Sequence, residues 1–267
     1  MKVGSEEKQS ILYSCLYRSK IQREQRVDFH SLVYIQSGII EFATSDGTKQ
    51  HKSGDIILVR RNQLSRSEKI PTASGQPFKS IALFLEPDLL QKYAIEKNVE
   101  HLPVYTGSKF LDLTSNKFLF AFFQSLLPYY DNPEALTPAL TELKSKEAIE
   151  LLLRSAGNAR EFLFDFSEPH KIDLESFMLK NFEFNVPVKE FARLSGRSIS
   201  TFKRDFQKLF ATTPEKWLKE QRLERAHYLI KNKKQKPADI YLRVGFENLS
   251  HFSTAFKEMF GVSPSMI

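Results

Sequence analysis

The hydrophobic and polar positions of the last hundred residues form the same helical pattern twice. Phenylalanines stand at positions 202, 206 and 210 and again at 252, 256 and 260, an offset of 50 residues. A glycine precedes each set, Gly196 and then Gly245, so one extra residue lies in the second turn. Apolar residues three to four apart mark one face of an α-helix, and glycine adopts the positive φ of a sharp turn at little cost. The pattern predicts two helix-turn-helix units.

The second helix of each unit is expected to start at a polar N-cap, Ser198 in the first copy and Asn248 in the second. Their buried stripes are predicted to be Phe202, Phe206 and Leu209, and Leu249, Phe252, Phe256 and Met259. The residues expected to point outward are Ser200, Lys203, Arg204 and Gln207 in the first copy and Ser250, Ser253, Thr254 and Lys257 in the second. The first face carries donors for phosphates and base edges, whereas the second is nearly uncharged and should discriminate bases weakly.

One helix is predicted to join the two units, from Pro214, with Thr213 as its cap, to Asn232. The predicted helix continues through Trp217, Leu218, Arg222, Ala226, Leu229 and Ile230 to a Lys-rich end at Lys231–Lys236. At roughly 1.5 Å per residue it is about 28 Å long, close to the roughly 34 Å between major-groove entries on one side of B-DNA. Such a helix would place both outward faces on adjacent turns of a duplex.

The positive charge of the chain is concentrated in the same region. Residues 173–267 hold 17 Lys and Arg against 11 Asp and Glu, whereas the preceding residues hold 22 against 21, within a net charge of +7. Since phosphate neutralisation dominates affinity for nucleic acid, this distribution favours a DNA-binding role.

The N-terminal half has a strand pattern, with turns predicted at Asp46-Gly47 and Gly54-Asp55. Strands are predicted at Leu32–Gln36, Ile39–Thr44, Ile56–Val59 and Ile81–Phe84, which together form a small β-barrel or sandwich. Two helices follow, over 118–130 and 138–154, and the second is capped by Thr137 and has an apolar side of Leu140, Leu143, Ile149, Leu152 and Leu153. Asp165–Lys171 is the predicted linker.

A length of 267 residues suits two domains, and we place them at 1–165 and 173–267, in an α+β fold. The single cysteine, Cys15, excludes an internal disulfide framework and suits a reducing cytosol. No apolar run approaches a membrane span, and the polar start Met1–Ser10 is unlike a signal peptide. We therefore expect a soluble cytoplasmic protein.

The C-terminal motifs resemble the DNA-binding domain of the AraC/XylS family of bacterial transcription regulators. The resemblance rests on both motifs and on the end of the second, Val244-Gly245-Phe246 and Phe260-Gly261-Val262-Ser263-Pro264. The resemblance implies a sequence-specific transcription activator that binds double-stranded DNA and RNA polymerase. It also implies contacts to base edges at Ser200, Lys203, Arg204, Ser250 and Thr254. The full set of DNA-binding candidates is Ser198, Ser200, Thr201, Lys203, Arg204, Gln207, Lys208, Asn248, Ser250, His251, Ser253, Thr254 and Lys257.

The strand and turn order of the N-terminal half resembles the cupin-like domain of the same family. The features that carry this resemblance are the strand ending at Ser37-Gly38, the hairpin, and Ser53-Gly54-Asp55 before an apolar strand ending in Arg60-Arg61. The resemblance implies a domain that senses a small molecule or binds a regulatory protein, followed by helices that form a homodimer.

Two alternatives remain open from the residues. One is a metal-dependent cupin enzyme that uses His30, Glu41 and His51, although these lack the paired-histidine spacing that brings two rings to one ion. No Ser/His/Asp order, phosphate loop or CxxC motif supports catalysis, so no catalytic residue, metal or cofactor is predicted. The other keeps DNA binding and makes the N-terminal domain a docking surface around Phe118, Phe120, Phe122 and Phe123.

Overall fold

The computed structural model describes residues 10–99, 102–155, 157–167, 169 and 171–267. Its N-terminal half consists of two antiparallel sheets, and the expected α+β class is confirmed. The strands are β1 (Ile11–Leu16), β2 (Lys20–Arg26), β3 (His30–Ser37), β4 (Ile39–Thr44), β5 (Gly47–Lys52), β6 (Ile56–Val59), β7 (Leu64–Ile70), β8 (Phe78–Leu85) and β9 (Phe110–Asp112).

One sheet has the strand order β1-β8-β3-β6-β9 and the other β2-β7-β4-β5. Within the described residues no ladder joins the two sheets, so the predicted barrel is open and has the form of a sandwich. The hairpin predicted at Asp46-Gly47 connects β4 and β5: Thr44 pairs with Gly47, whose φ is 112°. Glycine adopts this φ without strain, which explains the tight connection.

Strand β3 is buried on both sides, which explains its nearly continuous apolar sequence. Leu32 and Tyr34 contribute to a large core shared with the following helices. Their neighbours Val33 and Ile35 belong to two small clusters that also contain Phe42 of the second sheet. The alternation of side chains along one strand thus joins both layers.

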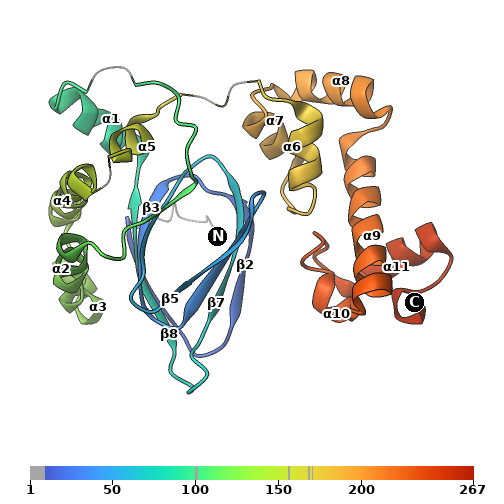
Figure 1. Cartoon of the computed structure of the whole chain (residues 1–267), viewed down its shortest axis with the longest axis horizontal. Helices are drawn as coiled ribbons and strands as arrows, with labels where there is room; N and C mark the ends of the chain where they lie inside the picture. The colour runs from blue at the N-terminus through green and yellow to red at the C-terminus, as the bar shows by residue number, and fades with distance from the viewer. Residues whose placement is uncertain (1–9, 100–101, 156, 168, 170) are drawn as a thin grey trace, which may run out of the picture.

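Helices cover the free face of the larger sheet. They are α1 (Pro87–Glu96), α2 (Lys117–Leu126), α3 (Pro128–Asp131), α4 (Pro138–Ser155) and α5 (Ala159–Phe164), with a short 3-10 helix at Pro133–Ala135 (Figure 1). The helix predicted over 118–130 is divided before Pro128, which lacks the N–H that a continuous helix needs. Thr137 caps α4 as expected, accepting a hydrogen bond from the Leu140 N–H at 3.3 Å. Leu143, expected on the apolar side, is instead 64% exposed.

The predicted linker is fastened to the N-terminal half at its start. Asp165 is buried, and its carboxylate is 2.5 Å from the Arg60 guanidinium and accepts the Tyr105 N–H at 3.0 Å. Glu168 and His170 of this linker lie outside the described residues, as does the polar start up to Gln9.

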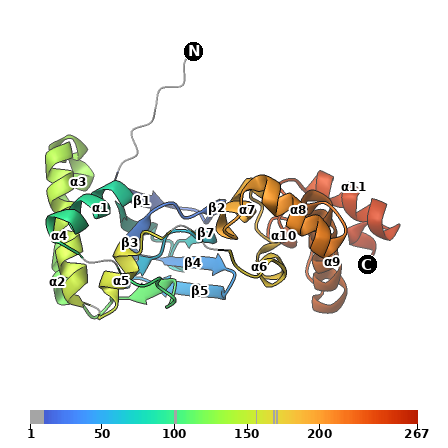
Figure 2. The ribbon, with the colours of Figure 1, turned by 90° about the horizontal axis from the view of Figure 1, so that it is seen from above.

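The C-terminal half is helical and lies on the opposite side of the sheets from α1–α5 (Figure 2). It consists of α6 (Leu174–Asn181), α7 (Val188–Leu194), α8 (Ile199–Phe210), α9 (Pro214–Lys233), α10 (Pro237–Ile240) and α11 (Leu249–Phe260), with a final 3-10 helix at Pro264–Met266. None of the described helices is long and apolar enough to cross a bilayer.

The sheet of β2 and β7 contacts both helix-turn-helix units. Leu64 of β7 belongs to the apolar core of the first unit. Arg26 forms an ion pair with Glu190 of α7, with 3.2 Å between Nε and Oε2. Arg66 Nη1 lies 3.2 Å from the carbonyl oxygen of Arg243, next to the turn of the second unit. Both units are therefore held against the N-terminal half.

Candidate nucleic-acid interface

Helix α8 is built as its sequence predicts. The Ser198 hydroxyl accepts a hydrogen bond from the Thr201 N–H at 3.3 Å, and Phe202 and Phe206 are fully buried. Leu209 was expected in the buried stripe and is 47% exposed, so this expectation is wrong. The polar candidates of this helix are exposed, apart from half-buried Thr201: they are Ser200, Lys203, Arg204, Gln207 and Lys208.

Helix α11 repeats the construction. The Asn248 side chain accepts hydrogen bonds from the N–H groups of Ser250 and His251, at 2.7 and 3.1 Å. The buried side consists of Phe252, Phe256 and Ala255, of which Ala255 was not predicted. Leu249 and Met259, which were expected there, are each 38% exposed. Two fully buried phenylalanines fill the narrow core side of each helix, which leaves the flanking apolar residues toward solvent.

The polar face of α11 is only partly free. Ser250, His251, Thr254 and Lys257 are exposed, while Ser253 is half-buried. The Ser253 hydroxyl donates to the Leu249 carbonyl oxygen at 2.8 Å within the helix. A hydroxyl engaged in this way is a weaker donor for an external ligand than its exposed neighbours.

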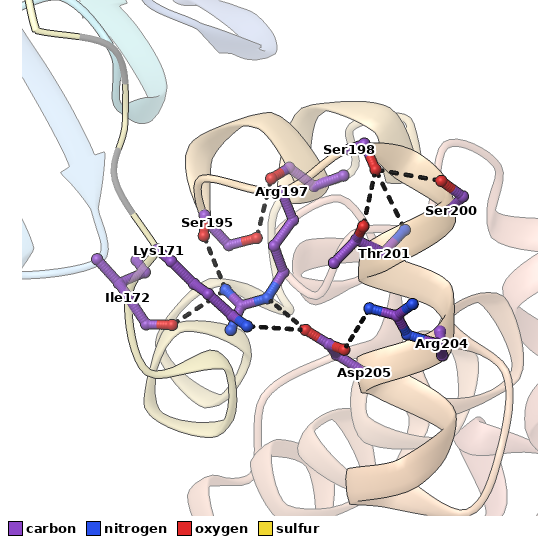
Figure 3. A network of polar contacts seen from close by, with 10 residues as sticks. Lys171, Ile172, Ser195, Arg197, Ser198, Ser200, Thr201, Arg204 and Asp205 are labelled. Atoms are coloured by element: carbon purple, nitrogen blue, oxygen red, sulfur yellow. Dashed lines mark hydrogen bonds and ion pairs between the residues drawn. The ribbon is translucent and has the colours of Figure 1, made fainter.

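An ion-pair network fixes the turn of the first unit (Figure 3). The Arg197 side chain, 6% exposed, donates to the carbonyl oxygens of Ile172 and Ser195 at 3.0 and 2.7 Å. Its Nε lies 3.2 Å from the carboxylate of Asp205 on α8. The hydrogen bond from Arg197 and the nearby charges of Lys171 and Arg204 lower the pKa of Asp205. Arg197 thereby ties the start of the C-terminal half to the middle of α8.

Neither Arg197 nor Asp205 is among the functional residues predicted from the sequence. The position of Arg197 corresponds to Phe246 in the second copy, at the offset of the two turn glycines, and Phe246 is buried. One copy therefore uses an ion pair where the other uses an aromatic ring. A difference of this kind between two otherwise matching copies is the signal that could have identified the pair.

The exposed cations Lys203 and Arg204 of α8 each have an acidic neighbour just beyond hydrogen-bond distance. Lys203 Nζ is 3.7 Å from Glu215, and Arg204 Nη2 is 3.7 Å from Asp205, with these cations 56% and 65% exposed. Exposed ion pairs of this length contribute little to stability. Both side chains are therefore available to an anionic ligand at low energetic cost.

Helix α9 is continuous over 20 residues, from its cap at Thr213 to the left-handed Lys234. At about 1.5 Å per residue it is about 30 Å long, in agreement with the predicted joining helix. Helix α8 lies at one end of α9, and α10 and α11 lie at the other (Figure 1). The turn glycines have the expected positive φ, 68° at Gly196 and 90° at Gly245.

The residues of the metal alternative have other partners. His30 is buried, its Nδ1 accepts the Arg61 N–H at 3.4 Å, and burial followed by the charges of Arg60 and Arg61 keeps its pKa well below the ordinary range. Glu41 pairs with Gln50, and His51 lies 3.9 Å from Asp55. Across the described ranges, no group of three or more His, Cys, Asp or Glu side chains is placed to hold a metal ion.

Two capped helices with exposed polar faces, joined by one straight helix, define a DNA-binding protein of the double helix-turn-helix class. A family model described as the ExsA N-terminal regulatory domain matches residues 30–164, more than half of the chain, and one described as a helix-turn-helix domain matches residues 191–267. The chain belongs to the AraC/XylS family of transcription regulators, as its sequence resemblance suggested.

Among curated relatives, the virulence regulon transcriptional activator VirF of Yersinia enterocolitica is 31% identical over 128 residues, 47% of this chain and 47% of its own length. The HTH-type transcriptional regulator ExsA of Pseudomonas aeruginosa is 30% identical over 130 residues, 48% of this chain and 47% of its own. The chain thus spans about half the length of these relatives. Among solved structures, ToxT of Vibrio cholerae aligns over 98% of both chains with 12% identity and a TM-score of 0.46.

Proposed function

We propose that this chain is a sequence-specific DNA-binding transcription regulator. Residues 173–267 bind DNA, and residues 1–165 control that binding. The observation that carries the proposal is the pair of exposed polar faces on α8 and α11, held at opposite ends of the continuous helix α9. The length of α9, about 30 Å, suits two successive major-groove entries about 34 Å apart.

Within the proposed interface the two helices have different roles. Helix α8 presents Lys203 and Arg204, whose charged donors suit guanine edges and phosphates. Helix α11 presents Ser250 and Thr254, which suit the backbone and the thymine methyl group. We assign supporting contacts to the helix starts and to the remaining polar positions: Ser198, Thr201, Gln207, Lys208, Asn248, His251, Ser253 and Lys257.

Footprinting on the upstream region of its own gene tests the proposal. We expect protection over two neighbouring turns on one side of the duplex. On that site, Lys203→Ala or Arg204→Ala should cost about 1–3 kcal/mol of binding free energy if the side chain contacts a base. An equal loss on random DNA would make the residue a phosphate contact. Lys92→Ala, which removes an exposed charge from α1, is the control. Absence of any sequence-selective protection by the wild-type chain would refute the proposal.

Control through the N-terminal half is the second part of the proposal. A cavity of about 360 Å³ lies between the two halves, lined by Asp46, Gln63 and Lys109 on one side and by Ser176 and Lys180 of α6 on the other. Gln63 is 5% exposed, and its Oε1 has no hydrogen-bond partner in the described part of the chain. Because a buried unpaired carbonyl is costly, this group favours a small ligand that donates a hydrogen bond.

Thermal unfolding in the presence of candidate small molecules tests this cavity, because a ligand bound only by the folded state raises the melting temperature. Ser176→Trp, which places a large ring at the cavity, should abolish the rise. A ligand that stabilises this variant as much as the wild type binds elsewhere. If the natural signal is a regulatory protein, that protein would act without filling the cavity.

The family and its relatives support a proposal for the remaining partners. VirF is named a transcriptional activator, and we propose the same direction here, with RNA polymerase as a partner and the cytoplasm as location. We also propose a homodimer, because Phe118 of α2 and Leu143 of α4 are 73% and 64% exposed. Sedimentation of the wild type and of Phe118→Asp measures this state, and an unchanged monomer in both would exclude the dimer.

A further inference from the structure

The two helix-turn-helix units have separate apolar cores. Trp217 and Leu218, near the start of α9, belong to the core of the first unit. Leu223 and the apolar residues after it belong to the core of the second unit. Among the described residues the two cores have no member in common. Apolar packing therefore attaches each unit to α9, and the angle between the units depends on other contacts.

Arg222 lies on α9 at the boundary between the two cores. It occupies a position of the core-facing stripe, four residues after Leu218 and four before Ala226, where an apolar residue is the rule. A charged side chain in a stripe of this kind requires partners that offset its lost hydration.

The guanidinium of Arg222 contacts both units. Its Nε donates to the carbonyl oxygen of Phe182 at 2.8 Å and its Nη2 to that of Phe184 at 2.9 Å, both in the segment between α6 and α7 of the first unit. Its Nη1 donates to the carbonyl oxygen of Gly245 at 3.3 Å, in the turn of the second unit. One planar group thus connects two backbone segments that are more than 60 residues apart in sequence.

The geometry around Gly245 shows how close this contact is. A Cβ atom at Gly245 would lie 2.7 Å from Arg222 Nε and 2.7 Å from the carbonyl oxygen of Glu183. Two further pairs join the same segments: Asn185 Nδ2 donates to Glu247 Oε1 at 3.0 Å, and Arg225 Nε lies 2.8 Å from Glu183 Oε1. We call the set of Phe182–Asn185, Arg222, Arg225 and Gly245–Glu247 the polar joint.

We propose that Arg222 is a positioning residue that fixes the angle between the two helix-turn-helix units, and thereby the spacing of the two DNA segments that the protein binds together. The inference rests on the proposed DNA-binding function. The Arg222 side chain acts through the backbone carbonyls that it contacts and is not one of the exposed residues of α8 and α11 proposed to bind DNA. Its fork of fixed N–H directions suits three carbonyl oxygens, whereas the single ammonium of a lysine cannot reproduce that pattern.

The test uses the full chain and three kinds of duplex. A two-element site is first selected by the wild-type protein from a random-sequence library. Derived duplexes then carry either one intact element with the other scrambled, or both elements with one or two base pairs added or removed between them. Binding of each is measured for the wild type, Arg222→Lys, Arg222→Met and the control Lys216→Met. Lys216 is an exposed cation of the same helix whose ion pair, with Glu220, stays within α9.

For both Arg222 variants we expect about a tenfold loss of affinity on the two-element duplex, with affinity for the single-element duplexes unchanged. The affinity of the Arg222 variants should depend less on the number of base pairs between the two elements, while Lys216→Met should show the same dependence as the wild type. Circular dichroism and Trp217 fluorescence establish that each variant is folded. A folded Arg222 variant with the wild-type spacing profile, or one with the same loss on every duplex, would overturn the inference. Failure of the wild type to select any site would instead refute the proposed function.

Discussion

Gly245 and Gly261 form a matched pair for a quantitative test of the polar joint. Both have a positive φ, 90° and 78°, and both lie in the second helix-turn-helix unit. A Cβ at Gly245 would meet Arg222 Nε and the Glu183 carbonyl oxygen, each at 2.7 Å, whereas a Cβ at Gly261 would meet nothing within 4 Å. Substitution by alanine therefore imposes the same backbone strain at both sites and a steric conflict at only one.

The magnitudes follow from these two terms. A left-handed backbone costs an alanine about 1–2 kcal/mol, and this is the whole effect expected for Gly261→Ala. Overpacking against backbone adds about 1–3 kcal/mol, so Gly245→Ala should lower the free energy of unfolding by about 2–5 kcal/mol. The conflict involves a main-chain oxygen, which cannot rotate away as the end of a flexible side chain would.

Urea unfolding measures the difference between the two variants. Trp217 is the one tryptophan of the chain and is buried against Phe206 and Phe210, so its fluorescence reports on the C-terminal half. Far-UV circular dichroism reports on the helices of both units. Equal losses for Gly245→Ala and Gly261→Ala would refute the close approach of the two units that the structure describes.

Two further changes test other features of the chain. Ala211 ends α8 with φ 54°, at the place where the second copy has a glycine. The variant Ala211→Gly should raise the free energy of unfolding by about 0.5–1 kcal/mol, because the relief of backbone strain exceeds the added chain entropy. A lower free energy of unfolding in urea for this variant would contradict the prediction. Burial, and then the charges of Arg60 and Arg61, lower the pKa of His30 well below 6.5, so the unfolded chain binds a proton that the folded chain does not. The free energy of unfolding should then decrease as pH falls below about 6.5, by up to about 1.4 kcal/mol per pH unit. The variant His30→Phe should show a weaker dependence of this free energy on pH. Equal slopes against pH for the variant and the wild type would argue against the prediction.

Local features of the C-terminal half could be predicted from the sequence. The caps at Ser198 and Asn248 and the positive φ of the turn glycines depend on residues within one helical turn, and the repeat supplied two independent instances of each. The joining helix was also predictable, because Thr213 and Pro214 mark its start.

Features that depend on distant partners could not be predicted. Arg197 bonds to a carbonyl 25 residues away and Arg222 to one 40 residues away, and no local pattern encodes a bond to a main-chain oxygen. Leu209 and Met259 were expected inside because their spacing suits a helical stripe, yet only a narrow side of each helix meets the core. The strand pattern predicted a barrel or a sandwich without deciding between them, because it does not specify which strand edges pair.

Leu64 of the N-terminal half packs into the apolar core of the DNA-binding half. This leucine is 3% exposed and belongs to the same apolar cluster as Met178, Leu194 and Phe206, although it is the first residue of a strand more than a hundred positions earlier. A fragment that contained only the last hundred residues would expose to solvent the apolar residues that Leu64 covers. Measurements on such a fragment would therefore understate the stability that the intact polypeptide gives to its own DNA-contacting helices.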